Sequence, residues 1–361
     1  MENIKDQISS AQTINVKAES VAPHPVNIHF RSGNLTLSGH LYIPADYLPG
    51  EKRQAVLVIA PGGGVKEQTS GRYAQELASK GFVTLAFDHR SYGQSEGYPR
   101  FDEDPFTKVE DTKNAVSYLT TRMEVDLERI GVMGICGGGG VAPTAAATDR
   151  RIKAVATVSG MMDQRGAMAD QFGDHATLVA VFEAGSKART AFASGEEPLY
   201  YPLIPPAGAP NVMELLKQAP DYYFNPARGA HPNWSNSILA YSLEKLATFS
   251  ALDTIRLISP HPILFIAGSK AASRQQNELA YQTADEPIPR SYFFYKRPVR
   301  MYRWSIGKHI SLFPVSKGFR QDNSFFYKDF PCQHLRPRTL AWSIHIATAF
   351  LRKIYVPFFH W

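Results

Sequence analysis

The segment Gly134–Gly138 (GICGG) constrains the fold of this chain more than any other feature. It follows Arg129–Met133, which is typical of a strand buried in a parallel sheet, and it leads into Gly138–Thr148, a helix-like stretch of small residues. A G-x-C-x-G turn between strand and helix holds its central side chain in a strained, accessible conformation, and this requires small neighbours. The pattern predicts a nucleophile elbow with Cys136 at its apex.

A packed core cysteine beside a glycine loop is the plainer interpretation of Cys136, because cysteine is among the most buried residue types. Three features together favour the elbow: the preceding strand, the five-residue spacing and the following helix. The N–H groups and the positive dipole end at the start of that helix also favour a thiolate over a thiol. We therefore predict Cys136 as a catalytic nucleophile.

Strand and helix patterns alternate over most of the first 287 residues. Apolar runs such as Ala55–Ala60 are typical of strands buried on both faces of a parallel sheet, and helical spacing follows, as in Thr69–Lys80. This alternation predicts an α/β fold with a doubly wound, mostly parallel sheet, and the elbow makes it an α/β-hydrolase fold. Further strands are expected at Val26–Phe30, Leu35–Ile43, Phe82–Phe87, Ile152–Val158 and Pro262–Ala267.

The alternation stops over residues 161–250, where Pro, Tyr and Phe are frequent. We expect this stretch to be an inserted helical lid or cap on a hydrolase core made of residues 25–160 and 251–287. Residues 1–24 are expected to be a flexible N-terminus, and they contain no apolar core of a signal peptide. Residues 288–361 are an atypical basic and aromatic tail.

This tail differs sharply from the rest of the chain in its composition. Residues 288–361 carry 13 Lys/Arg and 2 Asp/Glu, a net charge of +11, whereas the other 26 Lys/Arg and 31 Asp/Glu leave residues 1–287 at −5. The tail also holds 18 of the 42 aromatic residues and no Glu. We hypothesise that it derives from a shifted reading frame, a retained intron or a misdrawn gene model. Binding to nucleic acid or to an anionic membrane is the alternative that its charge suggests.

A second glycine turn, Pro61–Gly64 (PGGG), directly follows the expected strand Ala55–Ala60. An ordinary strand-to-helix turn needs one glycine, so three in a row indicate close approach of the backbone to a substrate. We predict an oxyanion hole formed by the N–H groups of Gly63 or Gly64 and of Gly137. The glycines match neither G-x-G-x-x-G nor a phosphate-binding loop, and nothing in the sequence supports a metal or flavin, so no cofactor is expected.

Five segments resemble the branch of α/β hydrolases related to dienelactone hydrolase. They are Pro61–Gln68, Asp88–Ser95, Gly134–Gly140, Tyr222–Gly229 with His231-Pro232, and Ala267–Ala271. Fungal members of this branch include polyketide transferases and hydrolases of secondary-metabolite clusters, host-selective toxin clusters among them. The resemblance implies an acyl hydrolase or acyltransferase that acts on an ester, lactone or thioester in fungal polyketide or toxin biosynthesis.

The resemblance also implies a catalytic histidine near the C-terminus and an acidic residue after a late strand. The family often has an Asp in the region of Ser269–Arg274, but this segment contains no carboxylate. Asp163, after Ile152–Val158, is the substitute we predict, with helix capping as its alternative role. The best match for the histidine segment is Gly307–Phe313, later than expected, which points to His309. Activity is expected to depend on this histidine.

The aromatic residues Tyr222, Tyr223 and Trp234 of the expected lid are candidates for substrate binding, with packing inside the lid as the alternative. We expect a small-molecule acyl substrate, such as a polyketide or a CoA thioester, and leave a homodimer open. A function of another class is a catalytically impaired α/β-hydrolase-fold protein that binds a metabolite or a partner, because the acid and the histidine are missing from their usual positions. The intact elbow argues against that alternative.

Composition guides the prediction of localisation. Two cysteines in 361 residues fit a reducing compartment better than a disulfide scaffold, and no apolar run reaches the roughly 18 residues of a membrane span. We expect a cytoplasmic enzyme without a nucleic-acid partner. A peroxisomal location is the alternative, although the C-terminal Phe359-His360-Trp361 is no targeting tripeptide.

Overall fold

An eight-stranded sheet forms the centre of the computed structural model, which describes residues 23–206, 209, 212, 214–217, 219–269, 271–284 and 290–295. The strands lie in the order β1-β2-β4-β3-β5-β6-β9-β10. β1 and β2 form an antiparallel hairpin, β2 is antiparallel to β4, and all other neighbours run parallel. The predicted α/β fold with a mostly parallel sheet is confirmed. The strands are β1 (Val26–Ser32), β2 (Leu35–Tyr42), β3 (Arg53–Ile59), β4 (Val83–Phe87), β5 (Val125–Ile135), β6 (Ile152–Val158), β9 (Ile263–Gly268) and β10 (Arg290–Tyr295).

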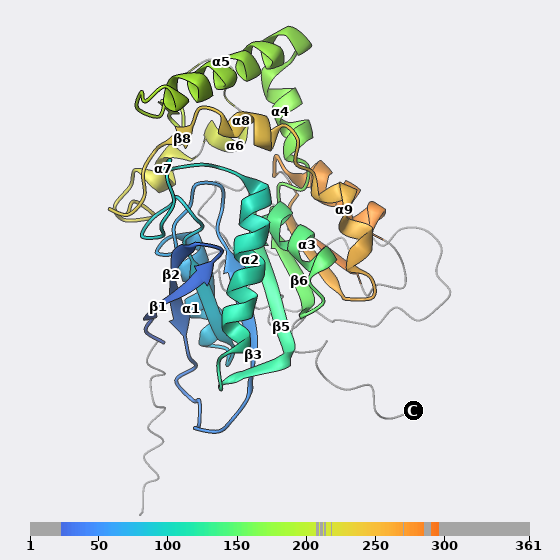
Figure 1. The fold of residues 1–361 in the computed structure, drawn as a ribbon. Coiled ribbons are helices and arrows are strands. Elements are labelled where there is room, and N and C mark those ends of the chain that lie inside the picture. Colours follow the sequence, from blue (N-terminus) through green and yellow to red (C-terminus); the bar gives the residue numbers. More distant parts are fainter. Residues whose placement is uncertain are drawn as a thin grey trace, which may run out of the picture.

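Helices cover both faces of this sheet (Figure 1). Side chains alternate along a strand, so β3 directs Leu57 and Ile59 into the core on one face and Val56 and Val58 into the core on the other. Helices α2, α3 and α9 contribute to the first core, and α1 contributes to the second. Burial on both sides explains the continuous apolar runs of the sequence. These helices are α1 (Thr69–Ala78), α2 (Pro105–Thr120), α3 (Gly138–Thr148) and α9 (Arg274–Thr283).

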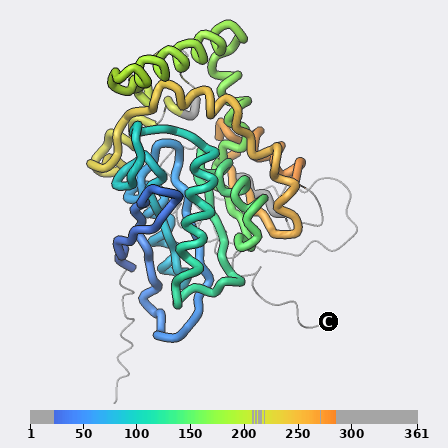
Figure 2. The backbone as a smooth tube through the Cα atoms, in the orientation of Figure 1, coloured from blue at the N-terminus to red at the C-terminus, as the bar shows by residue number. Residues whose placement is uncertain are grey.

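Residues 161–250, here called the insert, separate β6 from β9 and lie in the upper part of Figures 1 and 2. The two ends of the insert meet, because a β-bridge pairs Asp163 with Ser250 and the N–H of Arg165 donates to the carbonyl of Phe249 at 2.9 Å. The chain therefore leaves and re-enters the core at one place. The insert contains α4 (Gln164–Phe172), α5 (His175–Ala193), β7 (Tyr200–Tyr201), α6 (Glu214–Lys217), α7 (Pro220–Tyr223), β8 (Ile238–Leu239) and α8 (Ser242–Leu246).

The sheet continues beyond residue 287, where the sequence analysis ended the core. Residues 290–295 pair as β10, in parallel, with β9. The rest of the predicted basic tail, His309 included, lies outside the described residues. The sheet thus includes the start of the tail.

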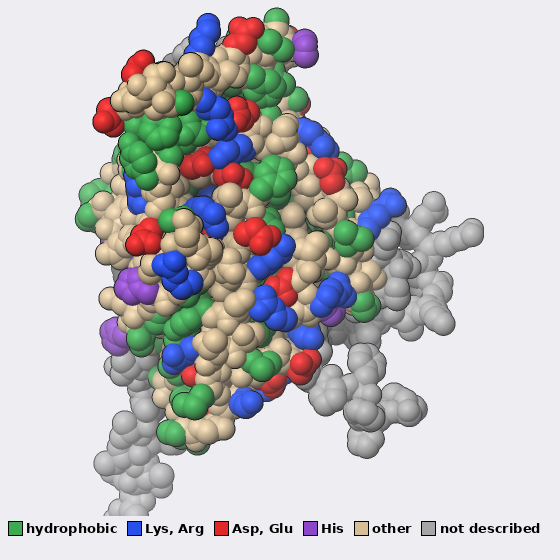
Figure 3. Space-filling view, viewed as in Figure 1, with side chains coloured by type: hydrophobic (Ala, Val, Ile, Leu, Met, Phe, Trp, Pro, Cys, Tyr) green, Lys and Arg blue, Asp and Glu red, His purple; other side chains and the backbone are tan. Residues whose placement is uncertain are grey.

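Acidic and basic side chains alternate over α2 and its neighbours on the face in Figure 3. Lys113 pairs with Glu110 at 2.7 Å and Arg151 with Asp149 at 2.6 Å. On this face the described acidic and basic side chains therefore offset one another's charge. Within the described part of the chain, every helix is too short or too polar to cross a membrane.

Candidate active site

Cys136 lies directly after β5 and has a φ of +52°, a left-handed backbone conformation that is uncommon for a residue with a side chain. Backbone hydrogen bonds hold it there. Its N–H donates to the carbonyl of Val158 at 3.1 Å, and its carbonyl accepts the N–H groups of Gly139 and Met161, each at 2.8 Å. The strand-to-helix turn predicted as an elbow therefore has the strained geometry that an elbow requires.

Close backbone contacts explain the glycines on either side of Cys136. A Cβ on Gly134 would overlap the carbonyl oxygen of Gly138, and a Cβ on Gly138 would lie 2.5 Å from the carbonyl oxygen of Ala60. Neither backbone oxygen can move without disturbing the sheet or helix α3. The turn can therefore close this tightly only because these positions carry no side chain.

The turn Pro61–Gly64, called the oxyanion turn after its predicted role, follows β3 and faces the elbow. The N–H groups of Gly62 and Gly137 both donate to the Cys136 sulfur. The N–H of Gly63 donates to Glu103 Oε2 at 2.9 Å, and that of Gly64 donates to the carbonyl of Pro61 at 3.0 Å. Both of these N–H groups, predicted as oxyanion donors, are thus already paired. Gly62 is the glycine of this turn whose N–H points at the Cys136 sulfur, together with the predicted Gly137.

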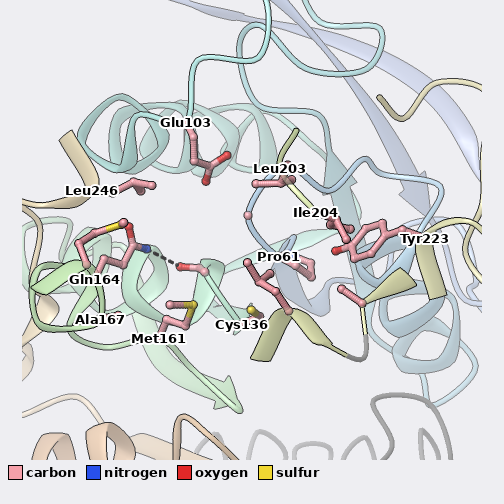
Figure 4. A pocket seen from close by; sticks show the side chains of 15 residues that line it. Pro61, Glu103, Cys136, Met161, Gln164, Ala167, Leu203, Ile204, Tyr223 and Leu246 are labelled. Atoms are coloured by element: carbon pink, nitrogen blue, oxygen red, sulfur yellow. Dashed lines mark hydrogen bonds between the residues drawn. The ribbon is translucent and has the colours of Figure 1, made fainter. Parts of the chain in front are cut away.

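An apolar cavity of about 130 Å³ opens in front of Cys136 (Figure 4). Ten of its fifteen lining residues belong to the insert, so the insert forms most of the wall. Glu103, from the loop before α2, is the one charged side chain among these lining residues, and its carboxylate lies across the cavity from Cys136 in Figure 4. The wall consists of Pro61, Gly62, Glu103, Cys136, Gly137, Met161, Gln164, Ala167, Met168, Leu203, Ile204, Leu216, Ala219, Tyr223 and Leu246.

The surroundings of Cys136 favour its protonated form. Burial raises the pKa of the thiol to about 11, the hydrogen bonds from Gly137 and Gly62 act in the opposite direction, and the Glu103 carboxylate adds to the rise. At neutral pH the resting residue is therefore a thiol. Nucleophilic attack by this sulfur requires a base that removes its proton.

Comparison with known proteins places this chain in a family. The profile of the Dienelactone hydrolase family matches residues 37–182. The uncharacterized protein PA2218 of Pseudomonas aeruginosa is 40% identical over 259 residues, which cover 70% of this chain and 69% of that protein. The chain belongs to the dienelactone hydrolase family. The crystal structure of PA2218 covers 76% of this chain and 86% of its own, with a TM-score of 0.69 and 35% identity.

Two more distant, fungal relatives carry names that state an activity. Thiohydrolase aneE of Aspergillus aculeatus is 29% identical over 268 residues, which cover 73% of this chain and 81% of that protein. Polyketide transferase grgF of a Penicillium species is 28% identical over 236 residues, which cover 64% of this chain and 74% of that protein. The crystal structure of the latter, described as an α/β hydrolase, matches with a TM-score of 0.64 and covers 75% of this chain and 90% of its own. At 23% identity that match shows the fold alone, and it confirms the predicted α/β-hydrolase fold.

The three aromatic residues predicted to bind substrate occupy different places in this dienelactone hydrolase family member. Tyr223 lines the cavity. Tyr222 accepts a hydrogen bond from Thr69 Oγ1 at 2.9 Å, and Trp234 stacks on Tyr223 with ring centroids 4.8 Å apart. Neither Tyr222 nor Trp234 is among the lining residues, and both pack against the ring of Tyr223.

The predicted acid, Asp163, lies directly before α4, where the two ends of the insert meet, and does not line the cavity. Its side chain caps no helix N–H, and its Oδ1 is buried without a hydrogen-bond partner among the described residues. His309, the predicted base, is outside the described residues. No histidine of the described ranges lines the cavity. The described residues of the site therefore bring together the sulfur and its two N–H donors, without a histidine.

Gly62, Glu103 and Gln164 are among the lining residues that sequence reasoning missed. Glu103 precedes Asp104-Pro105 at the start of a helix, a context that suggests capping rather than a site. Gln164 Nε2 donates to the carbonyl of Gly137 at 3.4 Å, a contact across 27 residues that no local pattern encodes.

Proposed function

We propose that this protein is an acyl hydrolase or acyltransferase in which Cys136 attacks the carbonyl carbon of an ester, lactone or thioester. The observation that carries the proposal is the left-handed Cys136 with the N–H groups of Gly62 and Gly137 at its sulfur, facing an apolar cavity. The family membership and the names of the fungal relatives support the same class of chemistry.

The proposed reaction begins when a base takes the thiol proton and the sulfur bonds to the carbonyl carbon. The carbonyl oxygen becomes an oxyanion, and the N–H groups of Gly62 and Gly137 stabilise it. Collapse of this intermediate expels the alcohol or thiol, which recovers the proton from the base, and leaves an acyl group on Cys136. Water or another acceptor then removes the acyl group, and this choice distinguishes hydrolysis from transfer.

For the base we propose His309, with Asp163 as the carboxylate that orients it. The family resemblance supports His309. The buried Oδ1 of Asp163 accepts no hydrogen bond from the described residues, and Arg165 Nε lies 3.9 Å away. This oxygen supports the second assignment, because it leaves an acceptor for an imidazole N–H.

For the substrate we propose an apolar acyl group bound to the protein through the wall of the insert. A cavity of about 130 Å³ with aliphatic, methionine and tyrosine side chains favours such a group over a charged one. The thiohydrolase and polyketide transferase names of the fungal relatives support a polyketide-derived thioester of secondary metabolism, toxin pathways included.

One observation favours a second candidate function, a protein that binds such a metabolite without turnover. The thiol is protonated at neutral pH, and none of the described residues that line the cavity is a histidine. The two candidates share the cavity and differ in what Cys136 does to the bound molecule.

Turnover of short p-nitrophenyl esters separates the two candidates. Wild-type protein should hydrolyse them, and Cys136→Ala should lose roughly 1,000-fold or more in kcat/KM, as expected for a missing nucleophile. Cys332→Ala is the matched control, since it removes the other cysteine of the chain. His309→Ala and Asp163→Asn test the proposed base and acid. Absence of both turnover and iodoacetamide labelling of Cys136 at neutral pH would favour the binding protein, whereas rapid labelling without turnover would indicate a reactive but impaired site.

A further inference from the structure

Glu103 is a buried carboxylate with a defined place in the wall opposite the thiol. Its side chain is 7% exposed, and both of its oxygens are used: Oε2 accepts the N–H of Gly63 at 2.9 Å, and Oε1 accepts from Lys108 Nζ at 2.5 Å. Its own N–H donates to Ser242 Oγ of α8 at 2.9 Å. Backbone and side chain are thus both fixed, so the carboxylate holds a set position against the oxyanion turn.

The bond to Gly63 decides the form of the oxyanion turn. The turn is closed by the Gly64 N–H to Pro61 carbonyl bond, and its third residue, Gly63, has a φ of +65° while Gly62 is not left-handed. This is the type II form, which differs from type I by rotation of the central peptide, between Gly62 and Gly63. Glycines adopt both forms easily. A carboxylate that accepts the N–H of that central peptide therefore selects type II.

Rotation of this peptide would change the site. The Gly62 carbonyl oxygen would turn to the side where the Gly63 N–H now lies, and the backbone angles of Gly62 and Gly63 would change. Gly62 carries the N–H that donates to the Cys136 sulfur, and an added Cβ on Gly137 would lie 2.9 Å from that nitrogen. The donor and the elbow are therefore in close contact, and a change in the turn moves the donor relative to the sulfur.

A carboxylate beside a developing oxyanion is unfavourable by its charge, and the structure compensates for it. Lys108 is buried, its ammonium pairs with Glu103, and it also lies 4.8 Å from the centre of the Tyr92 ring. The pair keeps the acceptor for Gly63 while it reduces the net charge near the sulfur.

From these contacts we propose that Glu103 is a positioning residue of the oxyanion hole. Its carboxylate fixes the type II form of Pro61–Gly64, and with it the aim of the Gly62 N–H, while Lys108 neutralises the carboxylate. The proposal rests on the proposed acyl chemistry of Cys136.

Two double variants isolate the acceptor from the charge. Glu103→Gln with Lys108→Met keeps an amide oxygen for the Gly63 N–H, and Glu103→Ala with Lys108→Met removes it; both lack the same two charges. With p-nitrophenyl esters, the Gln variant should keep kcat within about three-fold of wild type. The Ala variant should lose roughly ten- to one hundred-fold in kcat, because an oxyanion donor is misplaced, with KM little changed.

Iodoacetamide labelling of Cys136 at a series of pH values provides a second readout. Both variants should label over the same pH range, because both lack the same two charges. Equal kcat losses in the two variants, or full activity in the Ala variant, would overturn the proposal, and thermal unfolding midpoints check that both are folded. Failure of the proposed function would give a different result, in which Cys136→Ala turns over the esters as fast as wild type. Glu103 would then have no role in positioning an oxyanion donor.

Discussion

The elbow turn Gly134–Gly138 and the oxyanion turn Pro61–Gly64 both consist largely of glycine, yet the glycines meet different needs. In the elbow they are required because backbone oxygens leave no room for a Cβ. In the oxyanion turn they allow two peptide orientations, and a side chain from forty residues further along the chain selects one. The elbow is thus fixed by local packing, whereas the oxyanion turn depends on a distant hydrogen bond.

The largest effect is expected at the elbow. Gly134→Ala should lower the free energy of unfolding by more than about 4 kcal/mol, because its Cβ overlaps the backbone oxygen of Gly138 and neither strand nor helix can yield. Gly33→Ala is a control, since Gly33 also lies in a turn but has no atom near its missing Cβ. Urea unfolding measures both, and similar losses would contradict the packing argument.

The next effect concerns the ion pair behind the oxyanion turn. Lys108→Met should lower the free energy of unfolding by about 3 kcal/mol, because it leaves the buried Glu103 carboxylate without its cation. Adding Glu103→Gln should restore part of that loss, since no unpaired charge remains. A double-mutant cycle in urea checks this, and additive losses would show that the two side chains do not act as a pair.

A smaller loss of stability is expected in the oxyanion turn itself. Gly63→Ala should cost about 1–2 kcal/mol, the strain of a left-handed alanine, because the obstructing atom is the end of the mobile Leu203 side chain rather than backbone. Its loss of kcat with p-nitrophenyl esters should nevertheless exceed that of Gly33→Ala. If Gly63→Ala destabilises the protein as much as Gly134→Ala, the two turns do not differ in the way described.

The last effect is a dependence on pH, which leaves stability at neutral pH unchanged. Burial raises the pKa of Cys136 to about 11, so the folded protein holds this proton more tightly than the unfolded chain. The stabilisation is complete below the ordinary thiol pKa and is lost as the pH rises toward about 11. Labelling of Cys136 by iodoacetamide should increase over the same range. Rapid labelling at neutral pH would indicate a base next to the sulfur, the role proposed for His309.

The same contrast explains how far the sequence could predict the site. The strand, the G-x-C-x-G spacing and the small-residue helix are contiguous, so the fold and the position of Cys136 followed from local patterns. Local patterns could not predict which of the three consecutive glycines has an N–H free to face the sulfur. The N–H of Gly63 is hydrogen-bonded to Glu103, and that of Gly64 is hydrogen-bonded within the turn. Tyr222 and Tyr223 are adjacent and chemically identical, and only the packing of the insert directs one of them to the cavity. His309 and the orientation of Asp163 toward it stay predictions.

Because the two ends of the insert pair with each other, the insert can be exchanged without changing the core. Two backbone hydrogen bonds join these ends, Arg165 to Phe249 at 2.9 Å and Ala251 to Met162 at 2.8 Å. The length of the segment between them therefore does not affect the geometry of the sheet. A segment from a relative, grafted between these two contacts, would exchange most of the cavity wall while the sulfur and its N–H donors stayed in the core. For the proposed enzyme, selection can therefore act on substrate preference and on chemistry separately, since each would be encoded in a different stretch of the chain.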